Sequence, residues 1–143
     1  MEPQIETAAT AAPPIVVTRK DHDRLADLAA AASDRLPEVA DRLSAELARA
    51  RIVEKAAPSL VTMGAHVSFR DDESGEVRDV TLVYPKDQDL ARGRLSVLTP
   101  VGTALLGLTA GQSIPWKTRD GRWKTLTVVN AAQPAAASTG AEA

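Results

Sequence analysis

Residues 95–117 carry the signals of a strand, a short helix and a second strand in quick succession, which restricts the fold more than any other part of the chain. Leu95 and Val97 begin as a strand. Thr99-Pro100 then marks a helix start, because the threonine side chain can accept a hydrogen bond from a free N–H of the first turn and proline has no N–H to leave unpaired there. Apolar residues follow at helical spacing: Val101, Ala104, Leu105 and Leu108.

Two glycines end this predicted helix and return the chain to a strand. Gly107 and Gly111 can adopt the left-handed backbone that terminates a helix. Ile114 and Trp116 begin the next strand. The whole stretch therefore predicts a short helix held between two strands of a sheet.

Alternation of apolar and polar residues predicts the remaining strands. Residues 61–70 alternate and form a half-buried strand, and residues 78–84 form a second one, which Pro85 stops because proline cannot donate to the ladder. Asp120-Gly121 predicts a tight turn that joins strands 113–117 and 123–129. We expect a mainly antiparallel sheet with the short helix laid across it.

Two helices are predicted before the sheet. The first runs from Thr18, a possible cap, to about Arg35, and the second from Pro37 to about Ile52. Each has an apolar seam at helical spacing, formed by Leu25, Leu28, Ala32 and Leu36 in the first and by Val39, Leu43, Leu47 and Ala50 in the second. Helices of this kind bury their seams by folding back on one another, so we expect an antiparallel hairpin with its tip at residues 33–38. Arms of roughly 15 residues are about 23 Å long.

The fold class is therefore α+β: a short antiparallel helical hairpin that projects from an antiparallel sheet domain with one short helix. Residues 18–53 form the hairpin, 54–60 a linker and 61–130 the sheet domain. Residues 1–17 and 131–143 are rich in alanine and small polar residues, and we expect both to be disordered tails.

Composition limits the classes of function. Net charge is −2, which gives no general attraction to nucleic acid, and the absence of cysteine excludes disulfides and thiolate metal sites. No signal peptide or membrane span is predicted, which favours a cytoplasmic protein without membrane contact. Aromatic residues are few: Phe69, Tyr84, Trp116 and Trp123.

No catalytic, cofactor or metal site is predicted. The two histidines, His22 and His66, lie in separate elements, and the acids beside His22 point in different directions on a helix. No glycine-rich phosphate loop or zinc spacing is present. Trp116 and Trp123 lie on neighbouring strands, and we expect them to pair across the hairpin.

Several ordered blocks of the sequence resemble the Gre-type transcript cleavage factors, and most closely the Rnk branch of that family. They are residues 99–107 with 111–114, residues 64–70 and residues 81–85, and the resemblance covers roughly residues 19–129. It implies an FKBP-like sheet domain and RNA polymerase as the partner, with the helical hairpin in the secondary channel. The fold alone does not imply proline isomerase activity.

The resemblance also implies which residues meet the polymerase. Paired acids at the tip of a cleavage factor help to hold the second catalytic magnesium, and hard magnesium prefers oxygen ligands. Here the tip residues are Asp34, Arg35, Glu38 and Asp41. The intervening arginine and the short arms favour channel binding without cleavage. A solvated turn, with acids favoured by the helix dipole, is the alternative interpretation of the tip.

The resemblance implies a second surface, which matches the loop that in Gre factors lies near the rim of the polymerase channel. It consists of Leu98, Thr99, Pro100 and Val101, of which Thr99 and Pro100 also serve to start a helix. The basic residues of the 117–124 hairpin can meet nucleic acid phosphates or an acidic protein face, or be a solvated turn.

The predicted function is that of a non-enzymatic, monomeric regulator bound to RNA polymerase, with indirect contact to nucleic acid in the transcription complex. An accessory cleavage factor is the alternative. A regulator acting through metabolic partners is a third hypothesis, for which the sequence offers no nucleotide site.

Overall fold

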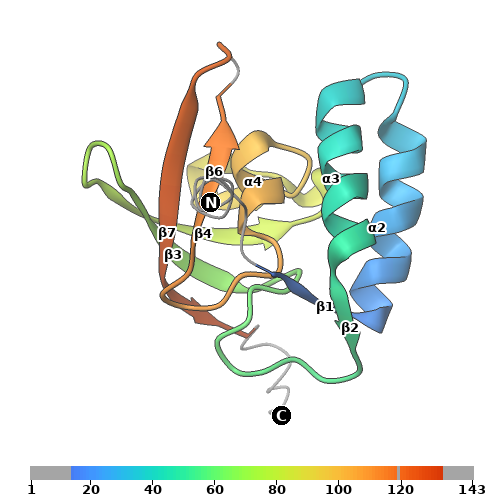
Figure 1. Cartoon of the computed structure of the whole chain (residues 1–143), viewed down its shortest axis with the longest axis horizontal. Coiled ribbons are helices and arrows are strands. Elements are labelled where there is room, and N and C mark those ends of the chain that lie inside the picture. Colours follow the sequence, from blue (N-terminus) through green and yellow to red (C-terminus); the bar gives the residue numbers. More distant parts are fainter. Residues whose placement is uncertain (1–13, 119, 134–143) are drawn as a thin grey trace, which may run out of the picture.

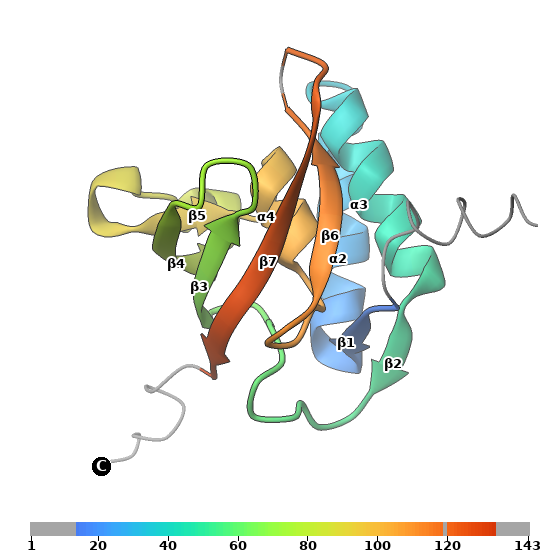
Figure 2. The same cartoon turned by 60° about the vertical axis from the view of Figure 1, so that its left-hand side comes forward.

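A computed structural model describes residues 14–118 and 120–133 of the chain. Two antiparallel helices stand beside a curled five-stranded sheet with a short helix packed against it, which confirms the predicted α+β class (Figures 1 and 2). The elements are β1 (Val16–Thr18), α2 (Arg19–Ala32), α3 (Pro37–Arg49), β2 (Arg51–Val53), β3 (His66–Asp71), β4 (Val77–Val83), the 3₁₀ turns η1 (Pro85–Asp87) and η2 (Leu90–Arg92), β5 (Arg94–Ser96), α4 (Pro100–Leu105), β6 (Ser113–Lys117) and β7 (Trp123–Ala132).

The helical hairpin forms where the sequence predicts it. Thr18 caps α2, because its side-chain oxygen accepts a hydrogen bond from the N–H of Asp21 at 3.2 Å. Proline at the first position of α3 fits the start of a helix, and the chain reverses through the turn before it. The buried seam is close to the predicted one but includes Ala29 and Ala40, and Leu36 is exposed at the tip.

Ile15 and Val17 belong to the core, so the expectation of a disordered tail over residues 1–17 is wrong for residues 15–17. β1 pairs in parallel with β2, with Val17 opposite Ile52. Ile15 is only 1% exposed, and its carbonyl accepts a hydrogen bond from the N–H of Arg51. Residues 1–13 lie outside the described part of the chain.

The five strands of the sheet follow the order β5-β4-β3-β7-β6, antiparallel except for the parallel pair β4–β5. β3 begins at His66 and not at residue 61, because Val61 exchanges backbone hydrogen bonds with the loop after α4 and Gly64 takes a φ of 85°. At the other end β7 continues to Ala132, with Ala131 buried, so residues 131–132 do not belong to a tail. Residues 134–143 are not described.

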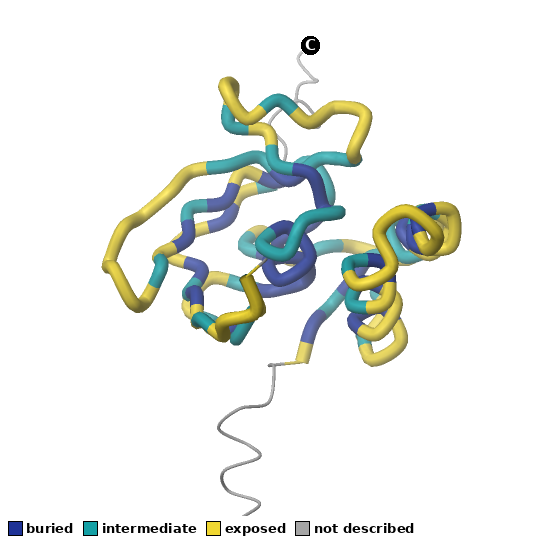
Figure 3. The backbone as a smooth tube through the Cα atoms, turned by 90° about the horizontal axis from the view of Figure 1, so that it is seen from above, coloured by how far each residue is buried: buried dark blue, intermediate teal, exposed yellow. Residues whose placement is uncertain are grey.

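The hairpin and the sheet share one hydrophobic core, and the hairpin lies beside the sheet domain along its length. Leu25, Ala29, Leu43 and Leu47 of the helices belong to the same buried cluster as Val67 and Leu126 of the sheet. Figure 3 shows buried segments, in dark blue, both in the sheet domain and in the two helices, with exposed loops around them. The expectation of a hairpin that projects from a separate sheet module is therefore corrected. Among the helices of the described ranges, none combines the length and apolar character needed to cross a bilayer.

Candidate interaction site

The tip of the hairpin presents the predicted charged residues to solvent. Asp34 and Arg35 lie in the turn after α2, and Glu38 and Asp41 lie in the first turns of α3. All four are exposed. Leu36 precedes α3 without a side-chain cap, and 39% of it is exposed beside these charges. The tip thus combines charged groups with one accessible leucine.

The second predicted surface lies at the start of α4. Thr99 holds this start, because its hydroxyl accepts from the N–H of Gly102 at 3.0 Å and donates to the carbonyl of Ser96 at 2.8 Å. Leu98 and Val101 are half-buried and pack against the core. The side chains of Thr99 and Pro100 are partly accessible. Thr99 therefore both caps α4 and belongs to the predicted surface.

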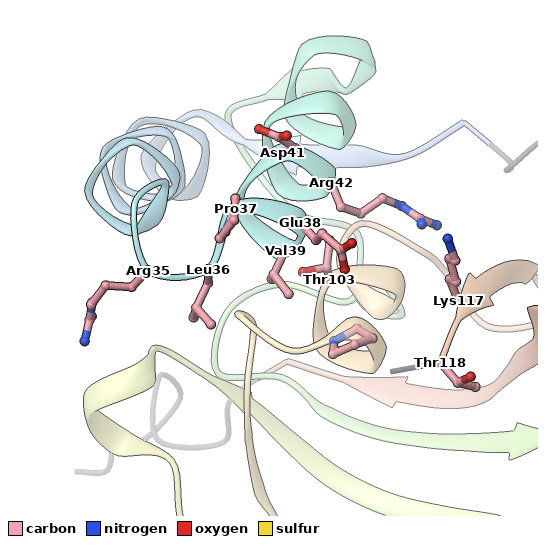
Figure 4. A pocket seen from close by; sticks show the side chains of 11 residues that line it. Arg35, Leu36, Pro37, Glu38, Val39, Asp41, Arg42, Thr103, Lys117 and Thr118 are labelled. Atoms are coloured by element: carbon pink, nitrogen blue, oxygen red, sulfur yellow. The ribbon is translucent and has the colours of Figure 1, made fainter. Parts of the chain in front are cut away.

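The structure brings the two predicted surfaces together. A cleft of about 840 Å³ lies between the hairpin tip and the sheet domain (Figure 4), lined by Arg35, Leu36, Pro37, Glu38, Val39, Asp41, Arg42, Pro100, Thr103, Lys117 and Thr118. A smaller cleft of about 350 Å³ beside it includes Arg35, Leu36 and Val39 from the hairpin and Leu98 and Thr99 from the other surface. Hairpin tip and α4 start therefore form one continuous hollowed surface.

Arg42 links the hairpin to the edge of the sheet, and sequence reasoning missed this residue. Its guanidinium donates to the carbonyl of Pro115 at 3.2 Å and lies 5.9 Å from the ring centre of Trp123. Glu46, almost buried on the next turn of α3, lies 3.7 Å from it and also accepts from Arg49. The spacing of Arg42 and Glu46, four residues apart on one helix face, is the signal that could have identified the pair.

The two tryptophans do not pair across the β6–β7 hairpin, which corrects the prediction. Trp116 lies opposite Lys124, and Trp123 lies opposite Lys117, so the two rings are on different faces. Trp116 packs against the core, whereas Trp123 is 62% exposed. The two tryptophans are offset by one residue in the register of the strands, and this offset places their side chains on opposite faces of the hairpin.

Two of the basic residues in this hairpin have acidic partners. Arg122 pairs with Asp120, and Lys124 donates to Asp71 at 2.6 Å. The hydrogen bond from Lys124 holds the pKa of Asp71 below its ordinary value, with help from backbone N–H groups of the following turn. Lys117 differs from these residues, since it forms no ion pair with any residue that the structure describes. Arg119 lies outside the described residues.

The histidines and the half-buried Tyr84 each lie against neighbouring side chains. His66 shares a hydrogen bond of 2.8 Å with Thr81 on the outer face of the sheet, and His22 lies 3.8 Å from Asp23. Burial raises the pKa of Tyr84, and Arg24 stacks 4.6 Å from its ring centre. Within residues 14–118 and 120–133, no three histidine or carboxylate side chains gather as metal ligands would.

Comparison with known proteins matches both halves of the chain. Residues 56–133 match the family "Transcription elongation factor, GreA/GreB, C-term", and residues 13–53 match the family "Rnk N-terminus". The regulator of nucleoside diphosphate kinase of Escherichia coli strain K12 is 41% identical over 107 residues, which are 73% of this chain and 79% of that protein. GreA of Nitratidesulfovibrio vulgaris (strain DSM 19637 / Miyazaki F) is 46% identical over 54 residues, 38% of this chain and 34% of GreA.

A solved structure has the same arrangement. The prokaryotic transcription elongation factor GreA/GreB from Nitrosomonas europaea superposes with a TM-score of 0.64 at 40% identity, covering 84% of this chain and 98% of that one. Three findings indicate the same family: the shared fold, the family match over the sheet domain and the relative that matches both halves of the chain. The chain is therefore a member of the GreA/GreB family of transcription factors, in the branch that carries the Rnk amino-terminal domain.

Proposed function

We propose that this protein regulates transcription by binding RNA polymerase at its secondary channel, without stimulating transcript cleavage. Membership of the GreA/GreB family supports polymerase as the partner. The hairpin tip (Asp34, Arg35, Glu38 and Asp41) would face the channel, and the start of α4 (Leu98, Thr99, Pro100 and Val101) would contact the rim. The protein would act as a cytoplasmic monomer, with no cofactor or catalytic residue of its own.

The continuous surface formed by the hairpin tip and the start of α4 supports a single docking face. Both regions line the same pair of clefts, and Leu36 and Leu98 are accessible beside the charged tip. Apolar side chains surrounded by polar groups are typical of protein interfaces. A partner that covers the tip would therefore cover the rim-contacting residues as well.

The short reach of the hairpin is the observation that carries the proposal. α2 has 14 residues and α3 has 13, so each helix is about 20 Å long. The tip lies at the same end of the molecule as the β6–β7 turn and does not extend past it (Figure 1). A finger that delivers carboxylates to a distant metal ion must extend beyond the body that carries it. This hairpin is better suited to occupying an entrance.

Single-cysteine cross-linking tests the docking geometry, because the chain has no cysteine of its own. We expect Asp34→Cys, carrying a photo-reactive label, to cross-link to the residues that line the secondary channel of the polymerase. Ser113→Cys, on the exposed side of β6, is the matched control and should not cross-link there. Failure of the full-length protein to associate with purified polymerase would exclude the proposal.

A cleavage-stimulating factor is the second candidate, and the tip carboxylates favour it. Asp34, Glu38 and Asp41 are exposed, and none forms an ion pair with the residues described here. Carboxylates that are free of cations remain available to a magnesium ion.

Backtracked polymerase complexes separate the two candidates. Under the main proposal the protein binds these complexes and leaves the RNA length unchanged. Release of short RNA that Asp34→Ala or Glu38→Ala abolishes, with Asp27→Ala in the middle of α2 as the control, would instead establish the second candidate.

A further inference from the structure

One group of side chains at the large cleft is not among the residues proposed to contact the polymerase. Arg42 from α3, Lys117 from the end of β6 and Trp123 from the start of β7 converge there. Lys117 and Trp123 are cross-strand partners and therefore share a face of the β6–β7 hairpin, while Arg42 approaches the indole ring to 5.9 Å. We call these three residues the cation–indole cluster.

The two cations of the cluster extend toward one another in Figure 4 and line the same cleft. Like charges repel, and the pair is only partly compensated: Glu46 lies 3.7 Å from Arg42, and Lys117 has no acidic partner in the described part of the chain. Of the other acids at the cleft, Glu38 is turned toward Thr103 in the same view. The arrangement therefore provides a local positive potential in a protein whose net charge is −2.

Trp123 adds an accessible aromatic surface to the two cations of the cluster. An indole that is 62% exposed leaves a large apolar face in water even with Arg42 against part of the ring. An accessible aromatic face beside cations is the arrangement on which nucleotides bind, because the base stacks on the ring and the phosphate meets the cations. An aliphatic or purely anionic ligand would use only one of these two features.

We propose that the cation–indole cluster binds a nucleotide unit, with its base stacked on Trp123 and its phosphate between Lys117 and Arg42. The unit is either part of single-stranded RNA or a free nucleotide. Recognition is insensitive to base identity, since stacking uses the face of the base and no side chain of the cluster reads its edge. The proposal stands independently of polymerase binding, because it concerns the isolated chain.

Fluorescence anisotropy of a labelled short oligoadenylate, titrated with the purified full-length protein, tests the site. We expect saturable binding, and a slope of log affinity against log salt of about −0.7, since the site neutralises one phosphate and each neutralised phosphate on a single strand contributes about −0.7. Lys117→Gln should weaken binding and bring this slope closer to zero. Trp123→Ala should weaken binding by about fivefold or more through lost stacking. Both side chains are exposed, so both variants should keep the wild-type circular dichroism spectrum.

The matched control for charge is Lys86→Gln, which removes one exposed lysine from η1 and should leave binding unchanged. Free ATP separates the two sources: displacement of the oligomer by ATP assigns a nucleotide site, and binding of the oligomer alone assigns a strand site, either of which supports the proposal. Equal affinity for an abasic oligomer or for polyglutamate would overturn it, because the base would then contribute nothing. Unchanged affinity of Trp123→Ala, or no binding of oligomer or ATP, would also overturn it.

Discussion

At the scale of single residues, Gly102 shows how closely α4 approaches the strand before it. A Cβ atom at this position would lie 2.1 Å from the carbonyl oxygen of Ser96 and 2.9 Å from the Cα of Val97. Both neighbours are backbone atoms and cannot move aside as a side chain tip can. The absence of a side chain therefore lets the start of α4, which carries residues of the proposed docking face, lie against the sheet.

Substitution of this glycine should disturb both stability and the predicted docking face. We expect Gly102→Ala to lower the free energy of unfolding by about 3 kcal/mol through overpacking. Urea denaturation followed by circular dichroism measures the change. Gly111→Ala is the control: its φ is 93° but its Cβ would meet no atom within 4 Å, so only backbone strain of about 1 kcal/mol is expected. Equal losses for the two variants would contradict the packing argument.

The ion pair between Asp71 and Lys124 predicts a dependence of stability on pH. The folded-state pKa of Asp71 lies below its ordinary value of 3.8, so the carboxylate stabilises the fold above that value and loses this contribution as the pH falls through the folded-state pKa. Lys124→Gln removes the charged donor whose hydrogen bond is the main cause of the lowered pKa of Asp71. We therefore expect the stability difference between wild type and this variant to shrink from pH 7 to pH 3, measured by urea denaturation. Lys55→Gln, an exposed lysine in the linker, should show no such convergence.

At the scale of elements, the start of α2 connects the hairpin to the sheet domain. Asp21 lies in the first turn of α2, and its carboxylate accepts a hydrogen bond from the N–H of Met63 at 3.1 Å. Met63 lies in the segment that leads into β3, 42 residues further along the chain. A carboxylate near a helix N-terminus is also favoured by the helix dipole.

Loss of this carboxylate should therefore destabilise the fold. We expect Asp21→Ala to lower the free energy of unfolding by about 1–3 kcal/mol, because the part-buried N–H of Met63 loses its acceptor. Asp27→Ala, which removes an exposed acid from the same helix, should change it by less than about 0.5 kcal/mol. Thermal unfolding at neutral pH compares the two variants, and a similar effect of both would argue against the contact with Met63.

Local signals predicted those elements that local residues determine. Thr18 and Thr99 cap their helices as expected, Gly107 and Gly111 take positive φ, and Gly121 closes the turn between β6 and β7. Each depends on neighbours a few residues away. The hairpin tip and the start of α4 were named as separate surfaces on the family resemblance, and their meeting at one pair of clefts was not predicted.

Long-range pairing explains what the sequence could not predict. β1 has three residues, and its partner β2 lies 35 positions further along the chain, so no periodic pattern is long enough to indicate the pair. The one-residue register between β6 and β7 decides that Trp123 faces Lys117 and not Trp116. Arg42 reaches Pro115 across 73 residues. These contacts arise only when helices and sheet pack together.

At the scale of the whole molecule, the single core predicts cooperative unfolding. Because Leu43 of the hairpin and Leu126 of the sheet belong to one buried cluster, neither part should remain folded when the other is disrupted. We expect Leu43→Ala to cost about 2–5 kcal/mol. Amide hydrogen exchange should then accelerate to the same degree in α3 and in β7. Faster exchange confined to the hairpin would show instead that the two parts unfold independently.

The parallel pair of β1 and β2 has a mechanical consequence. The hairpin enters from β1 and leaves into β2, and these two strands are hydrogen-bonded to each other at its base. A helical hairpin that is connected by one flexible segment can rotate relative to the rest of the protein. A hairpin whose two connecting strands are hydrogen-bonded to each other resists this rotation. The angle at which this hairpin meets a partner is thus set before the encounter, and a receptor with a differently oriented groove would have to adjust its own shape.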